Sequence, residues 1–140
     1  MEMQIKKLTE TAAIPSFAHD TDAGMDLYTD ERIIIMPGAR EVVRTGIAMA
    51  IPEGYVGLIW DKSGVAAKRG LKTFAGVIDA GYRGEVMVCL YNAGAEEQRF
   101  EQGDKIAQML IQKVEQPTLQ VVDDLDETLR GEGGFGSTGK

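Results

Sequence analysis

The stretch IAMAIPEGYVGLIW, residues 47–60, indicates the fold class most directly. In its first five residues, large side chains alternate with alanine, and a period of two is that of a pleated strand. The triplet PEG then supplies turn residues, and a second apolar segment, YVGLIW, follows directly. Short apolar segments separated by turn residues are the rhythm of an all-β domain.

The same rhythm extends along the whole chain, and no internal repeat interrupts it. Only SGVAAKRG, residues 63–70, looks helical, and it is long enough for two turns at most. The pattern therefore predicts an all-β fold, either a β-sandwich or a jelly roll. Strands are predicted at Met3–Leu8, Ile33–Met36, Glu41–Arg44, Ile47–Ile51, Tyr55–Trp60, Phe74–Ile78, Glu85–Tyr91, Lys105–Val114 and Leu119–Val122.

Two of these segments, VMVCLY and IAQMLI, are apolar on both faces of the strand. This pattern predicts burial on both sides, either between sheets or against another subunit. The single cysteine, Cys89, lies in the first of them, and we expect it to be a buried, reduced thiol. A protein without disulfides is expected to be cytoplasmic.

Bulk properties exclude several classes of function. A chain of 140 residues is expected to form one domain, and its net charge of −7 argues against a nucleic-acid polymer or an anionic membrane as partner. It does not exclude a small anionic substrate bound by a few cations in one pocket. No apolar run approaches the ~20 residues of a membrane span. The lone His19 lies in a polar loop, so metal binding by a His/Cys cluster is not expected.

The glycine-rich segment RGEGGFGSTGK, residues 130–140, contains GFGSTGK, which fits the phosphate-binding pattern GxxxxGK. That pattern needs a buried strand before it and a helix after it. Here an acidic, loop-like segment precedes it and no helix follows, so we reject a P-loop. A disordered tail is the simplest alternative. Arg130, Phe135, Ser137 and Thr138 offer instead a cation, a stacking ring and two hydroxyls for a flap over a nucleotide.

The stretch GVIDAGYRGE, residues 76–85, offers a candidate general base. Asp79 follows residues that read as core strand, so its carboxylate is expected to be partly desolvated at a strand end. The more common role of an aspartate before Ala-Gly is to shape a turn. Tyr82 is either a packing residue or a ring that lies against a sugar. The glycines allow close approach to a flat ligand.

Three further stretches carry polar groups in otherwise apolar surroundings. Lys62, Ser63 and the N–H of Gly64 begin the helical segment, which suits an anion, while Ser63 equally suits an N-cap. Gln108 interrupts an apolar strand, so its amide either ties the core together or faces a ligand. Asp26, between a methionine and a leucine, needs a partner, a metal or solvent.

The stretches AGMDL, KSGVA, GVIDAGYRGE, GDKIAQ and RGEGGFGSTG resemble, in sequence, order and spacing, the five motifs of the trimeric dUTP pyrophosphatase (dUTPase) family. The resemblance spans residues 22–139. It implies a homotrimer of jelly-roll-like β-sandwiches whose C-terminal flap is exchanged between subunits. Residues 1–122 would form the catalytic domain, and residues 123–140 an acidic linker and the flap. Each active site would be shared between subunits.

The resemblance also implies an activity, the hydrolysis of dUTP to dUMP and pyrophosphate. Asp79 would orient the water that attacks the α-phosphorus, and Gln108 would hold phosphate oxygens as the second catalytic residue. A Mg²⁺ ion would bind the triphosphate directly and reach Asp26 through water. The substrate-binding residues implied are Lys62, Ser63, Gly64, Thr73, Gly76, Val77, Ile78, Tyr82, Met87, Arg130, Phe135, Gly136, Ser137 and Thr138.

Within that set, Tyr82 would pack against the deoxyribose, Phe135 would stack on uracil, and main-chain groups of the hairpin 73–87 would read the base. The chain departs from the family pattern at two positions. Lys62 stands where arginine is frequent, and it lacks the bidentate fork. Thr73 stands where many relatives carry asparagine, which puts a side-chain contact to the base in doubt.

Two rival functions share the fold. A dCTP deaminase would lack the sequence Tyr-Arg-Gly-Glu after the aspartate, and this chain has it. A non-catalytic nucleotide-binding module would have lost Asp79 or the tail, and both are present.

Overall fold

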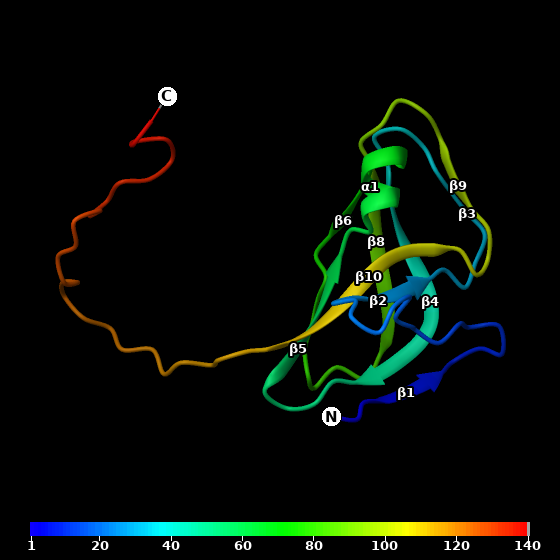
Figure 1. Cartoon of the computed structure of the whole chain (residues 1–140), viewed down its shortest axis with the longest axis horizontal. Coiled ribbons are helices and arrows are strands. Elements are labelled where there is room, and N and C mark those ends of the chain that lie inside the picture. The colour runs from blue at the N-terminus through cyan, green and yellow to red at the C-terminus, as the bar shows by residue number, and fades with distance from the viewer. Residues whose placement is uncertain (140) are drawn as a thin grey trace.

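The computed structural model describes residues 1–139, which form ten strands and one short helix. One antiparallel sheet has the order β1 (Gln4–Lys7), β4 (Arg40–Ala50), β8 (Glu85–Asn92), β6 (Leu71–Phe74). A second has the order β2 (Met25–Tyr28), β10 (Lys105–Lys113), β5 (Tyr55–Trp60), β7 (Val77–Ile78). A small third sheet pairs β3 (Ile33–Ile35) with β9 (Gln98–Phe100). The all-β prediction is confirmed (Figure 1).

The two four-stranded sheets share one apolar core. Val86, Val88 and Leu90 of β8 face it from the first sheet, and Ala107 and Met109 of β10 face it from the second. Alternation along the strands produces this arrangement, because side chains two residues apart share a face. The alternation predicted for residues 47–51 lies at the end of β4, although Ala48 is buried as well.

β4 was predicted as two strands and is one strand with a bulge. Its pairing with β8 shifts register between Arg44 and Ala48, and Gly46 there has a φ of +70°. A bulge inserts an extra residue and bends the strand, which explains the break in the sequence pattern. Thr45 in the bulge donates its hydroxyl to the carbonyl of Val86 on β8.

The predicted strand Phe74–Ile78 is divided into β6 and β7, which belong to different sheets. Between them Ala75 has a φ of +58° and Gly76 a φ of +102°. This is the left-handed region, where an extended strand cannot continue. Gly76 also leaves no room for a side chain, since a Cβ there would lie 2.9 Å from the carbonyl oxygen of Ile59.

Three other strand predictions differ from the structure. No strand was predicted at β2 or β9, because a four-residue and a three-residue strand each contain too few positions to show a period. The prediction of a strand at Leu119–Val122 was wrong. Those residues form no regular structure, and Val121 is 98% exposed.

The helix prediction is confirmed by α1 (Ser63–Arg69), which ends at Gly70 in the left-handed conformation typical of a C-cap. After β10, the N–H of Val114 still binds the carbonyl of Gly54, and residues 117–139 extend away from both sheets (Figure 1). No helix within residues 1–139 has the length and apolar character needed to cross a membrane.

The first sheet leaves an apolar outer face exposed, which we call the β8 outer face. It is formed by Val42 of β4, Met87, Cys89 and Tyr91 of β8, and Phe74 of β6. The rings of Phe74 and Tyr91 stack with centroids 5.2 Å apart. Val42 is 55% exposed and Cys89 is only half-buried. The single chain therefore does not provide the burial on both sides that the sequence of β8 predicts.

Candidate active site

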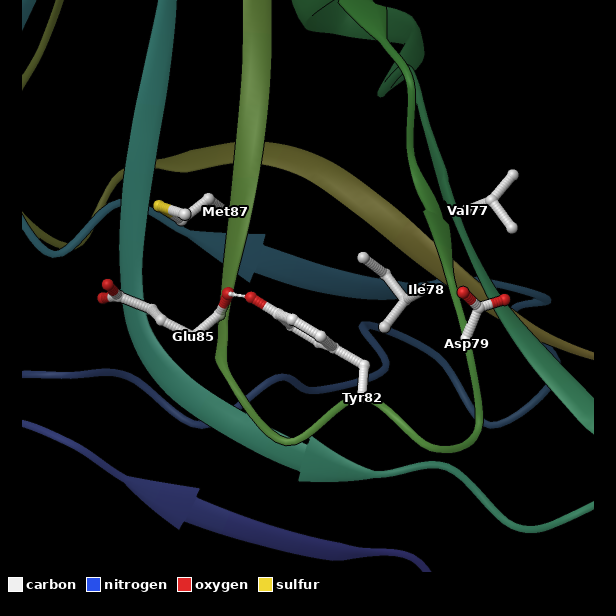
Figure 2. A pocket seen from close by; sticks show the side chains of 6 residues that line it. All are labelled: Val77, Ile78, Asp79, Tyr82, Glu85 and Met87. Carbon is white, nitrogen blue, oxygen red and sulfur yellow. Dashed lines mark hydrogen bonds between the residues drawn. The ribbon is translucent and has the colours of Figure 1, made fainter.

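The strands β7 and β8 and the turn between them enclose a pocket of about 260 Å³. Figure 2 shows Asp79 at the end of β7, Tyr82 after the turn, and Glu85 and Met87 on β8. The pocket is lined by Val77, Ile78, Asp79, Tyr82, Glu85 and Met87. Five of these six residues were predicted as site residues from the sequence, and the sixth, Glu85, was not.

The side chain of Tyr82 extends from the turn to the first residue of β8. Its hydroxyl donates a hydrogen bond of 2.9 Å to the carbonyl of Glu85 (Figure 2). The ring lies over Gly84, where a Cβ would be 2.5 Å from the hydroxyl oxygen and 2.6 Å from Cζ. Gly84 therefore permits the ring to fold back against the strand, and 40% of Tyr82 remains exposed to a ligand.

Asp79 begins the turn, because its carbonyl accepts the N–H of Tyr82 at 3.1 Å. The turn-forming role considered for this aspartate is therefore correct for its backbone. The side chain is exposed, not partly desolvated as expected. Its carboxylate stays accessible to a water molecule and a substrate in the pocket beside it.

A second group of polar side chains lies on the outer face of the second sheet. Gln108 of β10 pairs directly with Asp26 of β2 on one side and with Trp60 of β5 on the other. Directly paired residues share a face, so these three form a row across the sheet. The row joins residues of two motifs that are distant in the sequence, AGMDL and GDKIAQ.

Asp26 is nearly fully buried and is held by two lysines. Lys62 donates to its Oδ1 at 2.6 Å, and Lys105 Nζ lies 2.8 Å from its Oδ2 without good hydrogen-bond alignment. Burial alone would raise the pKa of Asp26. The close contacts and positive charges of Lys105 and Lys62 outweigh burial, so the pKa lies below its usual value. Asp26 thus finds the partner that its sequence context required.

Asp61 joins this polar row to the strand that leads into the hairpin. Its carboxylate accepts the N–H of Thr73 at 2.6 Å, the hydroxyl of Thr73 at 2.9 Å and the ammonium of Lys72 at 2.6 Å. Its carbonyl accepts Nε2 of Gln108 at 2.8 Å. Burial would raise the pKa of Asp61, and hydrogen bonds from Lys72 and Thr73 lower it below its usual value.

These contacts orient the side chains of two predicted site residues, Thr73 and Gln108. The buried hydroxyl of Thr73 is bound to Asp61, and Thr73 is absent from the lining of the hairpin pocket. Gln108 is half-buried with its amide oriented by Asp61, while its Oε1 lies over Gly24, where a Cβ would be 2.4 Å away.

Ser63 is not an N-cap. The capping position of α1 is Lys62, and no side chain caps the helix. Ser63 and Gly64 are exposed in the first turn. Their N–H and hydroxyl groups remain free to meet a ligand, which agrees with the other reading of this segment.

The C-terminal segment contributes the remaining predicted residues, and it lies apart from both groups (Figure 1). Arg130 donates from Nε to the carbonyl of Gly133 at 2.7 Å. Phe135 is fully exposed, with a φ of +51°, and Gly136, Ser137 and Thr138 are exposed after it. Within one chain, the tail therefore does not meet the hairpin pocket or the row of Asp26, Gln108 and Trp60.

The donor set fits a magnesium ion only if the ion arrives with a ligand. No group of three or more His, Cys, Asp or Glu side chains that could hold a metal occurs within residues 1–139. Asp26 Oδ2 is buried and has no aligned hydrogen bond, although the ammonium group of Lys105 lies 2.8 Å away, so a bridging water that displaces this group would find an acceptor there. Mg²⁺ commonly keeps several waters and takes one or two carboxylates plus substrate phosphates. Asp26 fits that description.

Sequence reasoning missed three residues of these groups, Asp61, Glu85 and Lys105. Glu85 and Lys105 stand inside the quoted motifs, at the last position of GVIDAGYRGE and the third position of GDKIAQ, and Asp61 directly precedes KSGVA. A charged residue beside a predicted site residue was the available signal. Their partners are distant in the sequence, so the sequence alone did not assign the contacts.

Comparisons with known proteins identify the family. A family model described as dUTPase matches residues 10–139. The deoxyuridine 5'-triphosphate nucleotidohydrolase of Corynebacterium glutamicum is 48% identical, with 99% of this chain and 95% of the relative covered. The enzyme of the same name from Thermobifida fusca is 46% identical, with 99% and 79% covered.

Solved structures show the same fold. The dUTPase of Staphylococcus bacteriophage 80alpha, solved with dUpNHpp, superposes with a TM-score of 0.94 at 33% identity and 99% coverage of both chains. A mutant dUTPase from phage phi11 of S. aureus, described with a structural Mg(II) ion, gives a TM-score of 0.84 at 31% identity, with 89% and 98% covered. The family model and the relatives span nearly the whole chain, and the chain belongs to the dUTPase family.

Proposed function

We propose that this protein hydrolyses dUTP to dUMP and pyrophosphate, in a homotrimer whose active sites are shared between subunits. Family membership supports the substrate and the reaction. The observation that carries the proposal in this chain is the hairpin pocket, where an accessible carboxylate, Asp79, and an anchored ring, Tyr82, line one cavity.

In the proposed reaction, Asp79 accepts a proton from the attacking water as the water oxygen bonds to the α-phosphorus. The bond from that phosphorus to the bridging oxygen breaks, and pyrophosphate leaves. A general base must lie within hydrogen-bond reach of the proton it removes. Asp79, at the rim of the pocket with its carboxylate exposed, meets that requirement for a water next to a bound nucleotide.

The walls of the pocket suit a uracil nucleoside. Val77, Ile78 and Met87 supply apolar surface, and the backbone of the hairpin reads the donor and acceptor pattern that distinguishes uracil from cytosine. Tyr82 lies against the deoxyribose, where a 2′-hydroxyl would meet the ring. Because Asp61 already holds the hydroxyl of Thr73, the base is read mainly by main-chain groups.

The polar row and α1 suit the phosphates. Ser63 and Gly64 present a hydroxyl and N–H groups, Gln108 an amide that Asp61 orients, and Lys62 a cation. A Mg²⁺ ion on the triphosphate would supply charge neutralisation for the departing pyrophosphate. Asp26 would hold that ion through a bridging water. Arg130, Gly136, Ser137 and Thr138 of the tail clamp the γ-phosphate, and Phe135 covers the base.

A trimer brings these groups together. In one chain the tail extends away from the hairpin pocket, so we assign the hairpin, the polar row and the tail of one site to different subunits. The β8 outer face supports such an assembly, because an exposed apolar face of stacked rings and aliphatic side chains is typical of a protein interface. A trimer would supply the burial on both sides that the sequence of β8 predicts.

Product analysis tests the proposal. The protein is incubated with dUTP, dCTP, dTTP and UTP in Mg²⁺, beside an Asp79→Asn variant, and nucleotides, pyrophosphate and ammonia are measured. Formation of dUMP and pyrophosphate from dUTP alone, and its loss in the variant, is the expected result. Ammonia from dCTP would indicate a deaminase, and binding of dUTP without turnover would indicate a nucleotide-binding module.

The tail is tested separately by NMR. We expect its amide signals to be those of a disordered segment in the free protein and to shift and broaden when dUpNHpp and Mg²⁺ are added. Tail signals that stay unchanged at saturating ligand would contradict a flap.

A further inference from the structure

We infer that Glu85 is a positioning residue that fixes the ring of Tyr82 and thereby sets the preference for deoxyribose over ribose. The inference rests on the proposed function, because it assigns Tyr82 to the sugar. Glu85 was not among the residues that the sequence identified. Its carboxylate binds strand β4 on the side of β8 that faces away from the ring, and its carbonyl binds the hydroxyl of Tyr82.

The first step concerns how Tyr82 is held. The residue is 40% exposed, and its ring rests on Gly84, which contributes no side chain. The fixed point of the ring is its hydroxyl, which donates to the carbonyl of Glu85 (Figure 2). The position of the ring therefore depends on the position of the first residue of β8.

The second step concerns how Glu85 itself is held. Its side chain is 14% exposed and reaches the bulge of β4, where Oε1 accepts the N–H of Gly46 at 2.9 Å and Oε2 accepts Nε of Arg44 at 3.0 Å. Both bonds involve a charged group, and such bonds are shorter and stronger than neutral ones. Glu85 thus uses its carboxylate for β4 and its carbonyl for Tyr82.

The third step is the consequence for the sugar. Ordinary ladder pairing of β4 with β8 is interrupted between Arg44 and Ala48, which includes the part of β4 beside Glu85. The carboxylate and the hydroxyl of Thr45 replace the missing ladder contacts. Without the carboxylate, the start of β8 and the ring attached to it gain freedom. Exclusion of a single 2′-hydroxyl depends on close fit, so discrimination is lost before catalysis is.

The test compares the ratio of kcat/KM for dUTP to that for UTP in the full-length wild type, in Glu85→Ala and in Glu85→Gln. We expect the ratio to fall about tenfold in Glu85→Ala, a typical effect of a small change in pocket fit. Glu85→Gln keeps one acceptor for Gly46 and should retain an intermediate ratio. We expect the loss to come chiefly from improved use of UTP and a raised KM for dUTP, with kcat for dUTP changed less.

Glu31→Gln is the matched control. Glu31 also accepts a backbone N–H of β4, that of Arg44 at 3.2 Å, but it does not contact the hairpin. We expect Glu31→Gln to retain the wild-type ratio. An equal fall in this control would show that loosening of β4 alone changes selectivity, which would overturn the assignment to Glu85.

Other outcomes are equally decisive. A wild-type ratio in a folded, active Glu85→Ala variant overturns the inference. If that variant does not fold, Arg44→Gln replaces it, because it removes only one of the two bonds to the carboxylate. A lower ratio then supports the inference and an unchanged ratio overturns it. If the wild type does not hydrolyse dUTP, the proposed function itself fails, a result distinct from hydrolysis with unchanged selectivity.

Discussion

At the scale of the residue, Gly84 determines whether the ring of Tyr82 can form one wall of the hairpin pocket. A Cβ at this position would overlap the ring of Tyr82, with 2.6 Å to Cζ. We predict that Gly84→Ala displaces the ring, lowers kcat/KM for dUTP about tenfold or more, and costs roughly 1–3 kcal/mol of stability through overpacking. Steady-state kinetics and urea unfolding measure the two effects.

Gly81 in the same turn provides the control. Nothing lies within 4 Å of a Cβ built there, and its φ is not in the left-handed region, so Gly81→Ala should retain wild-type kinetics. Equal losses in both variants would assign the effect to turn flexibility, not to the ring.

Asp26 gives the protein a pH dependence of known sign. Despite burial, Lys105 and Lys62 hold the pKa of Asp26 below the value of 3.8 of a free side chain. A carboxyl whose folded pKa is lowered contributes stability above the unfolded pKa, and the contribution disappears as pH falls through the folded pKa. We predict that the free energy of unfolding declines below about pH 4 and that Asp26→Asn reduces this decline.

The measurement is urea unfolding at a series of pH values from acid to neutral. At neutral pH, Asp26→Asn should already be less stable by about 1–3 kcal/mol, since two lysines lose their buried counter-ion. Asp20→Asn, in an exposed loop, should follow the wild type. If the free energy of unfolding of Asp26→Asn declined with pH as steeply as that of the wild type, Asp26 would not be the group responsible.

At the scale of the element, the corner between β5, α1 and β6 depends on Asp61. The buried hydroxyl of Thr73 donates to its carboxylate at 2.9 Å. We predict that Thr73→Val, which keeps the shape of the side chain, lowers the free energy of unfolding by about 1–2 kcal/mol and leaves kcat/KM for dUTP unchanged. Urea unfolding and a pyrophosphate-release assay check the two parts.

Thr118→Val, on an exposed residue after β10, should change neither quantity. A higher KM for dUTP with unchanged stability would be the opposite result for Thr73→Val. It would place the hydroxyl in contact with the base, in the manner of the asparagine that many relatives are expected to carry.

The elements show what the sequence could predict. Long apolar strands bounded by turn residues, such as β5, β8 and β10, were found within two residues of their ends. β4 was divided, because Gly46 in its bulge interrupts the period, and Phe74–Ile78 was joined, because nothing in the letters Ala75-Gly76 reveals positive φ angles. Leu119–Val122 has strand-forming side chains but no neighbour within the chain to pair with.

The site was predicted in the same uneven way. The structure places three predicted residues in one pocket, Asp79, Tyr82 and Met87. They are near in sequence, so a single turn is enough to bring them together. The ion pairs of Asp26 and the bonds of Asp61 cross between strands, so their partners depend on sheet order. Sheet order follows from long-range pairing, which short motifs do not encode.

At the scale of the whole molecule, the proposed trimer implies that Asp79 of one chain and the tail of another complete one site, because the two lie apart within a single chain (Figure 1). We predict that two inactive variants restore each other. Asp79→Asn keeps the tail, and a chain truncated after Leu129 keeps Asp79. Mixed in denaturant and refolded together, they should form trimers in which some sites combine an intact Asp79 with an intact tail from another chain.

The measurement is dUTP hydrolysis by the co-refolded mixture against each variant refolded alone, with trimer formation followed by gel filtration. Because residues 130–139 lie after the last strand and away from both sheets (Figure 1), the thermal unfolding of the shortened protein should match the wild type. Activity in the mixture requires that base and flap come from different chains. If every site used the hairpin and the tail of the same chain, each chain in a mixed trimer would lack one of the two, and the mixture would stay as inactive as its components.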